Sequence, residues 1–71
     1  MTPLLLAKSG ETGTIAEVHG KQEVKRYLAG MGFADGSKVT VISEIDGNLI
    51  VNVKDARIAL SKSMAAKIFI V

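Results

Sequence analysis

The sequence has no cysteine, no tryptophan, and only one histidine among its 71 residues. Without cysteine, the chain has no disulfide, no thiolate metal ligand and no cysteine nucleophile. A single histidine also excludes the usual His-rich zinc or iron site, so we expect neither a metal site nor a cofactor. No pair of carboxylates stands out as an acid/base couple, and no hydroxyl has a base partner. The sequence therefore predicts no catalytic residue and a protein that is not an enzyme.

Long apolar runs and dense basic clusters are missing as well. The longest wholly apolar runs have four residues, whereas a membrane-spanning helix needs roughly 20 in succession. No basic segment followed by a small-residue cleavage site marks a signal peptide, so we expect a cytoplasmic protein without direct membrane insertion. Nine Lys and Arg against seven Asp and Glu give a net charge of +2. Because these charges are spread along the chain, they disfavour a nucleic-acid partner.

The chain does have the composition of a small globular protein. Hydrophobic residues make up 48% of it and charged residues 23%, which is a globular and not a disordered balance. A chain of this length has room for one domain, which we expect over residues 1–71.

The first half of the sequence predicts a strand over residues 14–18 and a helix over residues 22–31. The uneven spacing of Ile15 and Val18 predicts a bulge or a short strand. In the helix, apolar residues at i, i+4 and i+7 share one face. Gly32 stands where a left-handed residue ends a helix, and Phe33 is expected to reach back to Leu28.

The second half alternates with a period of two, which is typical of strands. Asp46-Gly47 predicts a type I′ hairpin turn, and Lys54-Asp55 a second turn. Ser61 is expected to cap one helical turn before a terminal strand over residues 68–71. The residues expected on inner faces are Val39, Val41, Ile45, Leu49, Val51 and Val53. About five short strands with one inserted helix and a short C-terminal helical turn predict a mainly β fold, a small SH3-like barrel.

Two patterns resemble ligand sites, but each has a simpler structural interpretation. Gly30-x-Gly32-x-x-x-Gly36 is similar to a phosphate-binding loop, yet it follows a helix where such loops precede one, so we interpret it as capping and turn formation. His19 and Glu23 supply only two metal ligands, and His19 is expected to be a solvated residue at a strand end.

The ordered motifs of the chain resemble those of the ferrous iron transport protein A (FeoA) family. They are Leu28-x-x-Met31-Gly32-Phe33-x-x-Gly36-x-x-Val39, then Arg57-x-Ala59-Leu60, and Ala65 before Ile68. Gly10-x-x-Gly13 and the Leu-rich start also match, so the resemblance covers essentially the whole chain. One departure is Asp35, where members of the family often have proline, and it affects only the rigidity of the turn.

The resemblance implies a cytoplasmic accessory protein of bacterial ferrous iron uptake whose partner is the membrane transporter FeoB. We expect a non-catalytic module that binds and modulates FeoB. A glycine corner lets a partner approach the backbone while nearby bases supply polar contacts. The residues expected at the contact are Lys25, Arg26, Leu28, Met31, Gly32, Phe33 and Arg57.

Alternatives stay open at this point. Arg26 or Arg57 could stimulate GTP hydrolysis by FeoB, or His19 and carboxylates could carry ferrous iron. The chain is also similar to the SH3-like domain of iron-dependent repressors, although it begins at its own Met1 and contains no helix-turn-helix region. Leu4–Leu6 and residues 68–71 could close the barrel or pair two chains weakly.

Overall fold

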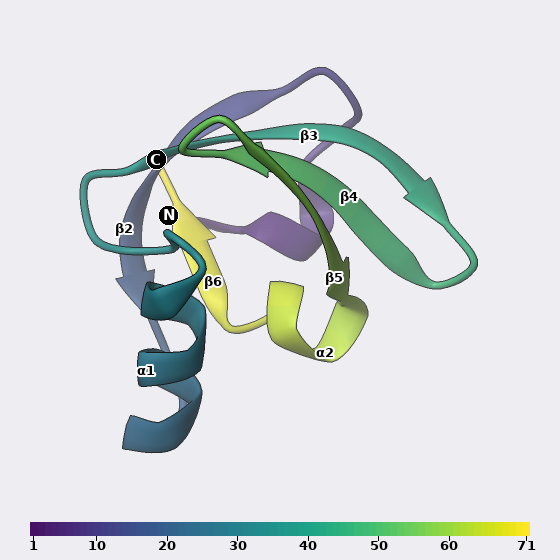
Figure 1. Ribbon diagram of the computed structural model, residues 1–71. Helices are drawn as coiled ribbons and strands as arrows, with labels where there is room; N and C mark the ends of the chain where they lie inside the picture. Colours follow the sequence, from purple (N-terminus) through teal and green to yellow (C-terminus); the bar gives the residue numbers. More distant parts are fainter.

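The computed structural model of the protein describes all residues from Met1 to Val71. Along the chain it contains β1 (Thr2–Pro3), the 3-10 helix η1 (Leu4–Leu6), β2 (Thr12–Val18), α1 (Gln22–Gly30), β3 (Lys38–Ile45), β4 (Asn48–Val53), β5 (Ala56–Ser61), α2 (Lys62–Ala65) and β6 (Ile68–Ile70). The strands pair in the antiparallel order β1-β6-β2-β3-β4-β5. This sheet curls round a shared interior, while α1 extends to one side (Figure 1).

The sheet has six strands, one more than the five expected. The extra strand, β1, pairs with β6 through Thr2 and Pro3. Two residues give no alternating pattern, and proline lacks the N–H of a regular ladder, so the sequence carried no signal for this strand. β6 pairs with both β1 and β2 of the same chain, so the terminal segment lies between these two strands in the sheet.

The bulge expected near Ile15 is confirmed. The register between β2 and β6 shifts between Ile15 and Glu17, and β2 begins two residues earlier than the expected strand. Ile15 is buried, and Val18 packs against the core from a partly buried position. The extra residue lets both side chains contact the interior although they are three positions apart.

Both hairpin turns are confirmed. Asp46 and Gly47 have φ values of 49° and 80°, and Lys54 and Asp55 have φ values of 48° and 63°. Two successive residues with positive φ are the signature of a type I′ turn, which joins strands with the right twist. The first turn follows the expected Asp-Gly preference, whereas the second holds two residues with a Cβ in the left-handed region.

The expectation that Ile45 faces inward is wrong. The register between β3 and β4 shifts between Val41 and Ser43, and Ile45 is 55% exposed. A bulge at this point breaks the alternation that placed Ile45 on the same face as Val39 and Val41. The hairpin tip therefore projects beyond the barrel (Figure 1).

The core is formed by aliphatic residues from the strands, one side chain from each of the three helical segments, and Phe33 from the loop after α1. All the other expected inward residues are buried, and Val24 and Met31 of the expected helical face pack against the core from partly buried positions. The buried residues are Leu4, Ile15, Leu28, Phe33, Val39, Val41, Leu49, Val51, Val53, Leu60, Ala65, Ile68 and Ile70. No buried side chain is polar or charged.

The helices are short. Ser61 caps α2, since its side chain accepts a hydrogen bond from the Met64 N–H at 3.3 Å. The longest helix, α1, has nine residues, and none of the helices is long and apolar enough to cross a membrane.

Candidate partner-binding surface

The end of α1 is a Schellman motif, as the sequence predicts. The Phe33 N–H donates to the Leu28 carbonyl at 3.0 Å, and the Gly32 N–H donates to the Ala29 carbonyl at 3.0 Å. These are the two hydrogen bonds that define this cap. Gly32 has φ of +103°, a conformation that glycine adopts without a Cβ penalty. The chain therefore turns sharply at Gly32 with its backbone partly exposed.

Gly32→Ala is expected to lower the free energy of unfolding by about 1 kcal/mol, because the new Cβ is forced into the left-handed region. Steric crowding does not cause this destabilisation, since the atom nearest to the added Cβ would be Lys54 Cγ at 3.4 Å. Chemical denaturation measures the change.

Gly30→Ala is the matched control. Gly30 is the last residue of α1 and has nothing within 4 Å of an added Cβ, so alanine should stabilise the helix by up to about 1 kcal/mol. Equal stability of Gly32→Ala and the wild type would show that Gly32 does not need its left-handed conformation.

The loop after α1 is fixed to the barrel by its backbone. The Gly36 N–H donates to the Ile15 carbonyl at 2.8 Å, and the Ile15 N–H donates to the Ser37 carbonyl at 2.8 Å. The cap of α1 holds the loop at Gly32 and Phe33, and β2 holds it at Gly36 and Ser37, so the corner at Gly32 is ordered before any partner arrives. A surface that is already ordered loses less conformational entropy on binding.

The structure separates the seven predicted contact residues into buried and exposed groups. Leu28 and Phe33 are 0% and 1% exposed, respectively. Their side chains belong to the core, where a partner docking on the folded protein does not reach them. The exposed or partly exposed residues are Lys25, Arg26, Met31, Gly32 and Arg57.

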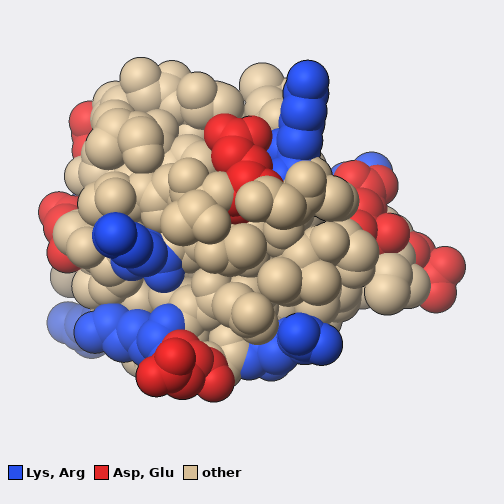
Figure 2. Space-filling view, turned by 90° about the horizontal axis from the view of Figure 1, so that it is seen from above, with Lys and Arg blue, Asp and Glu red and all other residues tan.

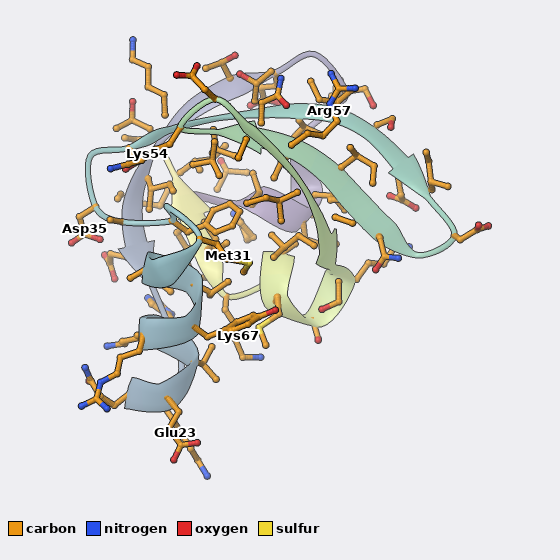
Figure 3. All side chains as sticks on the ribbon, in the orientation of Figure 1. Glu23, Met31, Asp35, Lys54, Arg57 and Lys67 are labelled. Atoms are coloured by element: carbon orange, nitrogen blue, oxygen red, sulfur yellow. The ribbon has the colours of Figure 1, made fainter.

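Lys54 connects two of these positions and was missed by the sequence analysis. Its stem lies over Gly32, and its side chain also lines a hollow with Arg57. Figure 3 shows Lys54 above the end of α1, with Arg57 farther along the top of the sheet. The sequence feature that could have indicated this position is the turn at Lys54-Asp55, which brings Lys54 back toward α1. We call Met31, Gly32 and Lys54 the glycine corner.

The hollow beside Arg57 lies on the outer face of the sheet and has a volume of about 490 Å³. None of its lining residues is hydrophobic. They are Thr40, Asn52, Lys54, Asp55 and Arg57, and we call this set the polar hollow.

A second depression lies between β2 and α1, with a volume of about 440 Å³. Its polar rim has mixed charge, from Glu17, His19, Lys25 and Asp35. His19 Nε2 lies 2.9 Å from Glu17 Oε1, and its ring contacts Phe69 in a tilted arrangement, with centroids 4.4 Å apart and an interplanar angle of 37°. His19 follows the last residue of β2 and its side chain is 54% exposed, as expected for a solvated residue at a strand end, and its hydrogen-bond partner is Glu17.

The cations near the glycine corner have no acidic partner. The carboxylates contact two basic side chains: Lys62–Glu44 is an ion pair, and His19–Glu17 is a hydrogen bond that becomes an ion pair only with a protonated imidazole. Lys54 and Arg57 belong to neither pair, and the same holds for Lys25 and Arg26 on α1. On the face shown in Figure 2, cations and carboxylates alternate over an uncharged surface. Such a surface offers separate points of charge to a partner in place of a continuous basic stripe.

Comparison with protein families gives a match over almost the whole chain. The family model described as "FeoA domain" matches residues 2–71. The chain is 33% identical over 70 residues to Fe(2+) transport protein A of Methanocaldococcus jannaschii, covering 99% of this chain and 85% of that protein.

Solved structures agree with this match. The crystal structure of an iron uptake regulatory protein (FeoA) has a TM-score of 0.91 and 26% identity, covering 99% of this chain and 93% of that one. Zinc-bound FeoA of Stenotrophomonas maltophilia, described as a prokaryotic SH3 domain protein, has a TM-score of 0.86 and 22% identity, covering 100% of this chain and 91% of that one. The predicted SH3-like fold is confirmed.

The fold is also related to repressor domains. A manganese-dependent transcriptional repressor has a TM-score of 0.87 and 28% identity, covering 97% of this chain but 40% of the repressor chain. The similarity to repressor domains that the sequence suggested is therefore confirmed as a similarity of fold.

Proposed function

Because these matches show that the chain belongs to the FeoA family, which is involved in ferrous iron transport, we propose that it binds and modulates the membrane transporter FeoB. The FeoA family is an accessory transport family and not a known enzyme family. The protein would act from the cytoplasmic side as a non-catalytic interaction module.

The observation that carries the proposal is the glycine corner. Here the backbone turns at the surface, and hydrogen bonds to β2 hold the following loop. Met31 packs partly against the core and leaves part of its side chain exposed. A flexible methionine beside an accessible backbone suits a protein contact, Lys54 adds a charge at the corner itself, and the unpaired Lys25 and Arg26 add charges on α1.

The direct test is a titration of FeoB, and separately of its cytoplasmic GTP-binding domain, with and without guanine nucleotide. We expect saturable binding in at least one nucleotide state. Because the net charge is only +2, long-range steering should be weak and the association rate should depend modestly on salt. Absence of binding to both forms in every nucleotide state would refute the proposal.

Removing either arginine should leave GTP hydrolysis by the FeoB complex within about twofold of wild type, because the proposed module is not catalytic. An inserted arginine finger contributes about 10³ to 10⁵ to turnover, so its removal would have a far larger effect. The variants are Arg26→Ala and Arg57→Ala, assayed at saturating protein so that weaker binding does not lower the rate. A loss of stimulation on the scale of an arginine finger in either variant would instead support a catalytic contribution.

A further inference from the structure

The polar hollow is the end of a row of polar side chains that crosses four neighbouring strands. Thr12 of β2 is the register partner of Thr40 in β3, Thr40 is that of Asn52 in β4, and Asn52 is that of Arg57 in β5. Directly paired residues point to the same side of a sheet. Since Val39, Val41, Val51 and Val53 fill the inner face, this row lies on the outer one.

Hydrogen bonds within the row prepare it to bind an anion. Arg57 Nε donates to Asn52 Oδ1 at 3.4 Å, and the Thr12 and Thr40 hydroxyl oxygens are 2.8 Å apart. The guanidinium makes no other hydrogen bond or ion pair, so its two terminal amino groups are free to hold a carboxylate in a bidentate arrangement. Of the two hydroxyls, one donates to the other, and the second proton is free for a ligand.

The charge of the polar hollow and the length of the row indicate which class of ligand fits them. Lys54 and Arg57 outweigh Asp55, so the hollow carries a net positive charge, and its lining has no hydrophobic residue. Small-molecule pockets are mostly apolar, which makes this hollow unsuited to a neutral organic ligand. The row spans three strand spacings, about 14 Å, which is the length of about four residues of extended chain and far exceeds a single phosphate.

We propose that the polar hollow and its row bind an extended acidic segment of a partner protein, with Arg57 and Lys54 holding its carboxylates. This inference rests on the function proposed above, because the hollow shares Lys54 with the glycine corner and so extends the same surface. Asp55 opposes an acidic ligand and limits its affinity. The Lys54 stem over Gly32 places the two contacts side by side.

The test uses a hexa-aspartate peptide titrated into the ¹⁵N-labelled protein at low salt, followed by amide chemical shifts. We expect shifts at Thr40, Asn52, Lys54 and Arg57. Arg57→Gln or Lys54→Gln should weaken binding about tenfold, since each removes a charge-assisted contact. Asp55→Asn should strengthen binding several-fold, and asparagine tolerates the positive φ of this position.

Lys21→Gln is the matched control, because it removes one positive charge before the N-terminal end of α1 without touching the hollow. Its peptide affinity should stay within twofold of wild type. Equal weakening by Lys21→Gln and Arg57→Gln would show a response to net charge and overturn the proposal. The same holds if no shifts appear, or if inorganic phosphate produces the same shifts at the same concentration as the peptide.

The peptide titration and the FeoB titration test two different proposals, and each can fail while the other succeeds. If FeoB does not bind but the peptide still selects the hollow, the partner proposed above is wrong and the acidic-segment site stands. If FeoB binds and Arg57→Gln leaves its affinity unchanged, the acidic-segment site is wrong and the glycine corner remains the contact. Retained amide dispersion in each variant shows that it is folded.

Discussion

Phe33→Ala is expected to lower the free energy of unfolding by about 3 to 5 kcal/mol, because it empties a buried aromatic site. Phe33 is 1% exposed and heads the fully buried side chains by volume. It also follows Gly32 as the last residue of the helix cap, so the cavity would open where α1 meets the barrel. Small domains have little stability to lose, roughly 0.05 to 0.15 kcal/mol per residue, and this one change would remove a large share of it.

Urea denaturation followed by circular dichroism measures this loss, with Phe33→Leu as the control. Leucine keeps most of the apolar volume and should cost less than half as much. If Phe33→Ala kept wild-type stability but lost FeoB binding, Phe33 would be a contact residue and its place in the core would be contradicted.

Gly13→Ala is expected to destabilise the protein by about 1 to 3 kcal/mol, because the core has no space for even one methyl group there. Gly13 is buried, and an added Cβ would lie 2.6 Å from Ile70 Cδ1 and 2.9 Å from Ile70 Cβ. The end of the isoleucine side chain can rotate away. Its Cβ cannot, since it is fixed to the backbone of β6, and β2 or β6 must shift.

A double-mutant cycle with Ile70→Val identifies this clash as the cause. Valine lacks Cδ1, the atom nearest to the new methyl group, so Ile70→Val should cost less in the Gly13→Ala background than in the wild type. Strict additivity of the two changes would show that the methyl group does not meet Ile70.

Local chemistry made much of the fold predictable. The helix end at Gly32, the type I′ turn at Asp46-Gly47 and the Ser61 cap each follow from a residue type that suits one backbone conformation. The prediction for Ile45 was wrong and β1 was not predicted, because a bulge and a two-residue strand depend on pairing with distant segments, which a local pattern does not record.

The candidate site was harder to predict for the same reason. Leu28 and Phe33 belong to the motif that defines the helix end, but their side chains point inward because the barrel packs against that end. Lys54 was missed because it lies far along the chain from Gly32. Only the hairpin turn at Lys54-Asp55, with both φ values positive, brings its stem over the corner.

The most direct test of the account is the map of amide chemical shifts when the cytoplasmic domain of FeoB binds the ¹⁵N-labelled protein. We predict that the largest changes centre on the glycine corner, at Met31, Gly32 and Lys54, while the hairpin tip at Asp46 and Gly47 stays unchanged. Changes centred on that tip, with none at the corner, would contradict the account.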